Sequence, residues 1–126
     1  MNIVAIVLSG ILAFMVGALW YSIIFGKVWM HEVGVNKETI ESSDGGKKEM
    51  LISLITEILV AFLIFYLLHH INLNVIFGGV VIAFIAVASS LKNYLFEMKS
   101  IKLILINESY KIVCIMIMTI TFYYLG

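Results

Sequence analysis

The stretch IVAIVLSGILAFMVGALWYSIIF, residues 3–25, contains no charged side chain, and it decides the fold class. An α-helix rises about 1.5 Å per residue, so a helix of this length crosses a hydrocarbon core of about 30 Å. Polar and apolar residues do not alternate, which argues against a barrel strand, the other structure that satisfies its backbone in lipid. The stretch lacks the basic leader and cleavage site of a signal peptide, so we expect a retained transmembrane helix.

Three further apolar runs of similar length follow, at residues 50–70, 75–96 and 101–125. Hydrophobic residues make up 63% of the chain, whereas soluble domains contain about 45–50%. The chain is therefore predicted to be an all-α integral membrane bundle of four transmembrane helices. Because the links between the runs are short, residues 1–126 are expected to form a single transmembrane domain.

The segment between the first two runs, residues 26–49, divides into two parts. Its start, in the sequence FGKVWMHEVGV, mixes apolar residues with charged and polar ones, which favours a short interfacial helix directly after the first span. The remainder is polar and contains an Asp-Gly-Gly turn signal, which is typical of a solvated connector.

The lysines indicate how the bundle sits in the membrane. Loops 26–49 and 97–102 carry Lys27, Lys37, Lys47, Lys48, Lys99 and Lys102. The N-terminus, the 71–74 loop and the C-terminus carry no basic residue. Short Lys-rich loops stay cytoplasmic. We therefore predict a multi-pass protein of the cell membrane with both loops cytoplasmic and both termini non-cytoplasmic.

Charged and amide side chains interrupt the last three runs at similar depths. Below the edge of the hydrocarbon on the loop 26–49 side, Glu57 lies at about 9 Å, Glu108 at about 8 Å and Lys111 at about 12 Å. The candidate intramembrane polar site consists of Glu57, Lys92, Asn93, Asn107, Glu108 and Lys111. Its two acids and two lysines balance in charge, and intramembrane charges usually face the bundle interior and pair.

This polar layer has several interpretations. It is a closed network that fixes helix register, or it lines a cytoplasm-facing cavity for a proton, a cation or a small polar substrate. The second interpretation makes the protein a small transporter or permeation-linked protein that uses Glu57 and Glu108. A third makes it an accessory subunit of a membrane complex. Lys92 is also shallow enough for its long side chain to reach the interface.

Small residues recur every four positions in the first run, at Ala5, Ser9, Ala13 and Gly17. Such a stripe lets a second helix approach closely. It predicts either packing inside the bundle or a contact with a second copy or another membrane protein.

Several classes of function lack support in the sequence. There is no HExxH motif, no cysteine pair and no carboxylate cluster with metal-ligand spacing, so no metal or other cofactor is expected. No nucleophile–base set is visible, which argues against an enzyme. Basic and acidic residues are equal in number, at eight each, so no nucleic-acid partner is indicated. The expected surroundings are the lipid bilayer.

Two stretches carry a family resemblance. WYSIIFGKVW, residues 20–29, and NYLFEMKSIKLILINESY, residues 93–110, resemble the signature of the family called domain of unknown function 1761. The resemblance implies a small four-span membrane protein and implies no activity. Ile23, Glu108 and Lys111 depart from that family's pattern, so the resemblance carries no chemistry for the polar layer.

The first of these stretches also has a physical interpretation. Trp20 and Tyr21 place a ring N–H and a hydroxyl in the polar layer, Gly26 lets the chain turn out of the helix, and Trp29 anchors the next segment at the headgroups. These four residues form a candidate corner motif over the cytoplasmic end of the bundle. The motif is either a structural corner or a ligand contact.

Overall fold

The computed structural model describes residues 2–34 and 47–126, and every regular element in these residues is helical. The chain is thus an all-α bundle with four long helices and a short helix after the first, as predicted. Most of the predicted polar connector lies outside the described residues. The elements are α1 (Ile3–Leu19), η1 (Trp20–Ile24), α2 (Gly26–Val33), α4 (Lys47–His70), α5 (Val75–Phe96) and α6 (Ile101–Leu125).

Four helical segments are long and apolar enough to cross a membrane, which identifies a multi-pass membrane protein. They are Ile3–Ile24, Lys47–His70, Val75–Phe96 and Ile101–Leu125. The third and fourth match the predicted bounds. The second begins three residues earlier than expected, because the charged residues before the apolar run continue the helix.

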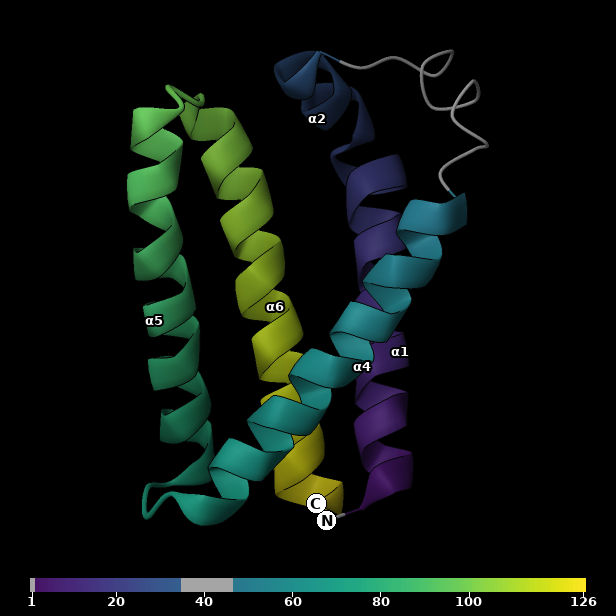
Figure 1. The fold of residues 1–126 in the computed structure, drawn as a ribbon, viewed down its shortest axis with the longest axis vertical. Coiled ribbons are helices and arrows are strands. Elements are labelled where there is room, and N and C mark those ends of the chain that lie inside the picture. The colour runs from purple at the N-terminus through teal and green to yellow at the C-terminus, as the bar shows by residue number, and fades with distance from the viewer. Residues whose placement is uncertain (1, 35–46) are drawn as a thin grey trace.

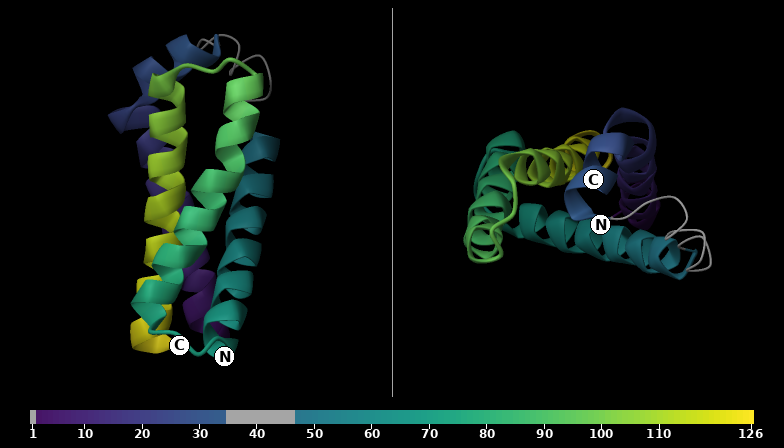
Figure 2. Two further views of the ribbon diagram at one scale, coloured as in Figure 1. Left: turned by 90° about the vertical axis from the view of Figure 1, so that its left-hand side faces the viewer. Right: turned by 90° about the horizontal axis from the view of Figure 1, so that it is seen from above.

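Both termini lie at one end of the bundle, and α2 lies at the other end with the turn between α5 and α6 (Figures 1 and 2). This opposite end is called the α2 end below. Helix α1 packs against α4 and α6, and α5 packs against α6. Helix α4 crosses the bundle obliquely, from the neighbourhood of α1 at the α2 end to the turn into α5 (Figure 1). The described parts of the lysine-bearing loops 26–49 and 97–102 lie at the α2 end. The cytoplasmic location of this end stays a prediction.

Side-chain caps define where three helices begin. Asn2 accepts a hydrogen bond from the Ala5 amide at 3.2 Å, and Ser100 accepts one from the Leu103 amide at 3.2 Å. Asn74 caps α5 in the same way. Each cap satisfies amide groups that have no partner within the helix. Gly34 ends α2 with φ +76°, a left-handed conformation that glycine adopts without strain.

The small-residue stripe of α1 is buried within the chain. Ala5, Ser9 and Ala13 are at most 1% exposed, and a Cβ atom added to the neighbouring Gly10 would lie 2.8 Å from the Cα atom of Ile58 in α4. The stripe therefore lets α1 approach its neighbours closely. A contact of this stripe with a second copy or another protein stays a prediction.

Helix α1 passes into a single turn of π-helix, η1, before the chain bends into α2. The Phe25 amide donates to the carbonyl oxygen of Trp20 at 2.9 Å, the five-residue spacing of a π-helix. Such turns interrupt α-helices and occur frequently at functional sites. Here the wider turn carries Trp20 and Tyr21, the first two residues of the predicted corner motif.

Candidate functional site

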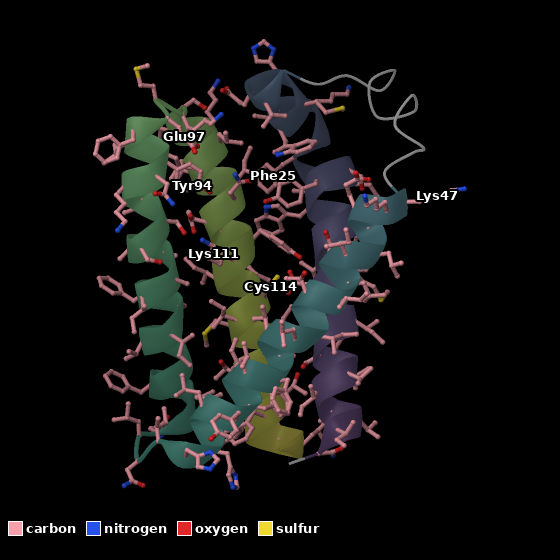
Figure 3. The ribbon with its side chains drawn as sticks, viewed as in Figure 1. Phe25, Lys47, Tyr94, Glu97, Lys111 and Cys114 are labelled. Atoms are coloured by element: carbon pink, nitrogen blue, oxygen red, sulfur yellow. The ribbon has the colours of Figure 1, made fainter. Side chains whose placement is uncertain are left out.

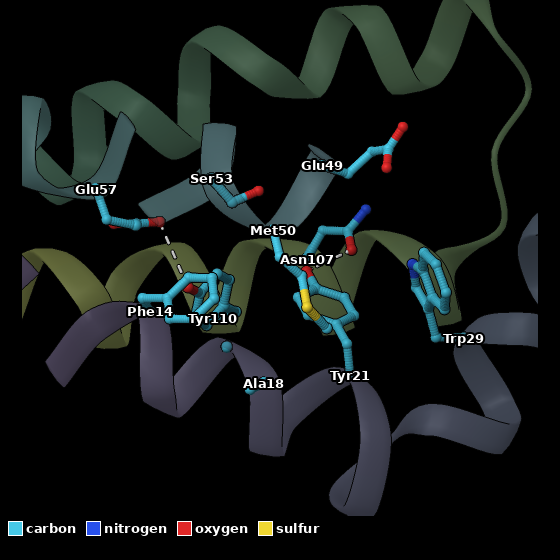
Figure 4. A pocket seen from close by; sticks show the side chains of 11 residues that line it. Phe14, Ala18, Tyr21, Trp29, Glu49, Met50, Ser53, Glu57, Asn107 and Tyr110 are labelled. Carbon is cyan, nitrogen blue, oxygen red and sulfur yellow. Dashed lines mark hydrogen bonds between the residues drawn. The ribbon is translucent and has the colours of Figure 1, made fainter. Parts of the chain in front are cut away.

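A cavity of about 590 Å³ opens at the α2 end between α1, α4 and α6 (Figure 4). Its volume falls within the range of about 300–1,000 Å³ that is typical of small-molecule sites. The described residues that line it are Phe14, Gly17, Ala18, Tyr21, Trp29, Glu49, Met50, Ser53, Glu57, Asn107 and Tyr110. Glu57 lies at one end of this row and Trp29 at the other (Figure 4).

Helix α4 contributes its acidic and polar side chains to one wall. Glu49, Ser53 and Glu57 recur every four residues, so they share one face of the helix. Glu49 is exposed, whereas Glu57 is partly buried. The acidic character of the cavity therefore extends from its mouth to its inner end.

At the inner end, Tyr110 joins three helices. Its hydroxyl donates to the carbonyl oxygen of Ala13 in α1, at 2.9 Å, and lies 3.4 Å from Oε1 of Glu57 in α4. Its ring packs against Gly17, where a Cβ atom would overlap the Tyr110 hydroxyl. Glycine at this position of α1 is therefore required for Tyr110 to reach Glu57.

Helix η1 is fixed to α6 by two hydrogen bonds from the corner motif. The indole N–H of Trp20 donates to the carbonyl oxygen of Ile106 at 3.0 Å, and the Tyr21 hydroxyl donates to Oδ1 of Asn107 at 2.8 Å. Both polar groups of Trp20 and Tyr21 thus form hydrogen bonds to α6. The second bond also orients Asn107, a predicted site residue, in the cavity wall.

Aromatic rings from three elements form the wall opposite α4. Tyr21 of η1 packs edge-on against Trp29 of α2, at 5.5 Å between ring centroids, and against Tyr110 of α6, at 5.4 Å. The neighbouring rings stand at 69° and 81° to each other. Trp29 therefore belongs to the cavity wall, in addition to its expected position near the headgroups.

The bend between η1 and α2 depends on Gly26. This residue is buried, and a Cβ atom added to it would lie 3.1 Å from the carbonyl oxygen of Tyr21. Helix α2 is also linked to the start of α6, because the Ser100 hydroxyl donates to Oε2 of Glu32 at 2.6 Å. The bend and this bond together hold Trp29 over the cavity.

A second polar group lies between α6 and α5 (Figure 3). Lys111 Nζ is 3.0 Å from Glu108 Oε2 and 3.2 Å from Oε1, and it donates to the Ser90 hydroxyl at 2.5 Å. Glu108 is 5% exposed. Oε2 has no partner with hydrogen-bond geometry among the described residues, so its contact with Lys111 is electrostatic. Tyr94 of α5 lies beside Glu108 and Asn107.

The six predicted polar-site residues are therefore brought together in part. Asn107 and Tyr110 share the face of α6 that lines the cavity, whereas Glu108 and Lys111 lie on the neighbouring face, about 100° around the helix. Glu57 joins the first group. Lys92 and Asn93 are exposed on α5.

A family model described as Protein of unknown function (DUF1761) matches residues 4–123. The chain belongs to this family. No curated protein and no solved structure matches it. The resemblance of the two aromatic stretches to the family is thus confirmed. None of these three comparisons assigns an activity to this DUF1761 chain.

Sequence reasoning missed several cavity residues of this DUF1761 protein, and Tyr110 is the most consequential of them. The spacing of three between Asn107 and Tyr110 placed both on one face of α6. The repeat of Glu49, Ser53 and Glu57 likewise pointed to a polar face of α4. Both signals were available in the sequence. No group of three or more His, Cys, Asp or Glu residues with metal-binding geometry occurs within residues 2–34 and 47–126.

Proposed function

We propose that this protein binds a small solute in the cavity of α1, α4 and α6 and takes part in its passage across the cell membrane, with Glu57 as the ligand-contacting carboxylate. One observation carries the proposal. The cavity ends at an intramembrane acid, and the described residues that line it include no Lys, Arg or His.

The energetic argument compares the two intramembrane acids. A carboxylate within a membrane is costly, and such groups usually pair or mark a path for ions and substrates. Glu108 has Lys111 as its partner. Among the described residues, Glu57 has the neutral Tyr110 hydroxyl, at a long 3.4 Å. A structural role thus accounts for Glu108, whereas binding of a solute accounts for Glu57.

The proposed entrance is on the cytoplasmic side. The cavity opens at the α2 end, where Lys27, Lys47, Lys48 and Lys99 lie near the ends of the helices. Lys-rich short loops remain in the cytoplasm. A solute therefore enters from the cytoplasm and reaches Glu57 past Glu49 and Ser53.

Thiol labelling tests this access. Cys114 is the single cysteine, so Cys114→Ala provides a cysteine-free background. In that background Ser53→Cys places a thiol in the cavity wall, and Ile55→Cys places one on an exposed apolar face of α4 that does not line the cavity. A membrane-impermeant methanethiosulfonate reagent applied to inside-out vesicles should label position 53 and spare position 55.

Opposite vesicle orientations locate the entrance. With a cytoplasmic entrance, right-side-out vesicles should leave the Ser53→Cys thiol unlabelled until the membrane is dissolved. Absence of labelling at position 53 in both orientations, together with labelling in denaturant, would show that the cavity is closed to water and would overturn the proposal.

A further inference from the structure

The lining of the cavity selects among ligand charges. We infer that its ligand is a monovalent organic cation, with a quaternary or protonated ammonium group at the inner end beside Glu57 and Tyr110. The apolar body of this cation lies along Tyr21 and Trp29 (Figure 4). This inference rests on the proposed function and specifies the chemical class of its solute.

Charge is the first argument. The described lining contains two carboxylates, Glu49 and Glu57, and no basic side chain. An anion would meet uncompensated repulsion there, because like charges interact strongly where water is partly excluded. A neutral solute would leave an intramembrane carboxylate without a counter-charge. A cation supplies that counter-charge and lowers the cost of keeping Glu57 ionised.

The aromatic wall gives the second argument. Cations are attracted to the faces of Trp and Tyr rings at distances within about 6 Å of the ring centroid. Three such rings line one cavity, with centroids of neighbours 5.5 Å and 5.4 Å apart. Neighbouring rings meet edge to face, at 69° and 81°, so they form a continuous aromatic wall rather than a stack. Quaternary ammonium ligands are recognised by groups of aromatic side chains.

Volume separates an organic cation from a proton or a metal ion. A space of about 590 Å³ is far larger than a bare ion requires, and it matches a small organic molecule. Phe14 and Met50 supply apolar surface for the body of such a molecule. A metal ion would need several converging ligands, and the described residues contain no such group.

Equilibrium dialysis of the purified full chain in detergent tests the inference. The probes are benzyltrimethylammonium, benzyl alcohol and benzenesulfonate, which share a ring and differ in charge. The cation should bind saturably and at least about tenfold more tightly than the alcohol, and the sulfonate should not bind. Empty micelles measure the partitioning of each probe into detergent.

Matched variants assign the binding to the cavity. Glu57→Gln should weaken binding of the cation at least about tenfold, and Trp29→Leu about threefold or more. Glu97→Gln removes an exposed acid outside the cavity and should change the affinity by less than about twofold. Each variant is first compared with the parent chain by circular dichroism and size-exclusion elution. Trp29→Leu serves as the principal variant if Glu57→Gln does not fold.

The outcomes separate the two proposals. If the Ser53→Cys thiol is labelled but the cation binds no better than benzyl alcohol, or if binding is insensitive to both variants, the cation inference is overturned and the solute-binding proposal stands. If the thiol is not labelled and no probe binds, both are overturned. If benzenesulfonate binds more tightly than benzyltrimethylammonium, the cavity prefers anions, and the cation inference is likewise overturned.

Discussion

The Tyr110 hydroxyl lies 3.4 Å from Oε1 of Glu57, and this contact joins α6 to α4 at the inner end of the cavity. The same hydroxyl donates to the Ala13 carbonyl oxygen of α1 at 2.9 Å. One side chain thereby connects α6 to both α1 and α4.

Removal of the Tyr110 hydroxyl should weaken the contacts between the three helices, while the ring of residue 110 still lines the cavity. We expect Tyr110→Phe to lower the free energy of unfolding by about 1 kcal/mol, the net contribution of a typical hydrogen bond. Unfolding in a denaturing detergent, followed by circular dichroism, measures the change. Tyr123→Phe is the matched control, because Tyr123 is 55% exposed, and it should have no effect. Equal effects of the two variants would show that the Tyr110 hydroxyl contributes nothing specific.

The contact between α1 and α4 predicts intolerance at Gly10. A Cβ atom there would lie 2.8 Å from the Cα and Cγ1 atoms of Ile58, and the Cα atom belongs to a helix backbone that cannot rotate away. Gly10→Ala should therefore destabilise the chain by about 1–3 kcal/mol, the usual cost of overpacking. Ala88→Val adds methyl groups to an exposed position of α5 and should be close to neutral. A Gly10→Ala chain of parental stability would contradict the observed approach of the two helices.

The Glu108–Lys111 pair predicts non-additive substitutions. Glu108→Gln leaves the Lys111 charge without its partner, and Lys111→Met leaves a buried carboxylate, so each should cost about 1–3 kcal/mol of unfolding free energy. The double variant removes both charges, so its loss of unfolding free energy should be smaller than the sum of the two single losses. We expect the double variant to keep the fold. A double-mutant cycle measured by detergent unfolding gives the coupling. Additive effects would show that the pair is not an energetic unit.

The position of the loops relative to the membrane is a separate prediction. In the Cys114→Ala background, Lys99→Cys should react with an impermeant thiol reagent in inside-out vesicles, and Asn72→Cys should react in right-side-out vesicles. Both residues are exposed, so the thiols are accessible wherever water reaches them. The physical basis is the retention of Lys-rich loops in the cytoplasm. The opposite labelling pattern would invert the topology and place the entrance of the cavity outside the cell.

Hydropathy was sufficient to predict the four long helices because lipid imposes the same two conditions on every span. A run such as 75–96 must be apolar and about 30 Å long, and both properties are visible in the sequence. The observed helix Val75–Phe96 has these bounds. The start of α4 was missed because charged residues at a helix end are compatible with water, so hydropathy does not mark the point where the helix begins.

The position of a residue along its helix predicts its depth in the membrane. It does not predict the direction in which the side chain points around the helix axis. Glu57, Lys92 and Glu108 have similar depths, yet Lys92 is exposed and Glu108 pairs on a face of α6 that does not line the cavity. Rotation of each helix is set by side-chain packing, such as Tyr110 against Gly17. Contacts of this kind join residues far apart in the chain, and the spacing within one helix does not reveal them.

Both tryptophans of the protein lie in the corner motif, so they provide an intrinsic fluorescent probe of this region. Its two tryptophans are Trp20, whose ring centroid lies 6.2 Å from that of Tyr110, and Trp29, which lies 5.5 Å from Tyr21. Its tryptophan fluorescence therefore originates at the α2 end, from Trp29 in the cavity wall and from Trp20 beside Tyr110. A ligand that contacts Trp29 should therefore change the tryptophan emission spectrum without an attached label.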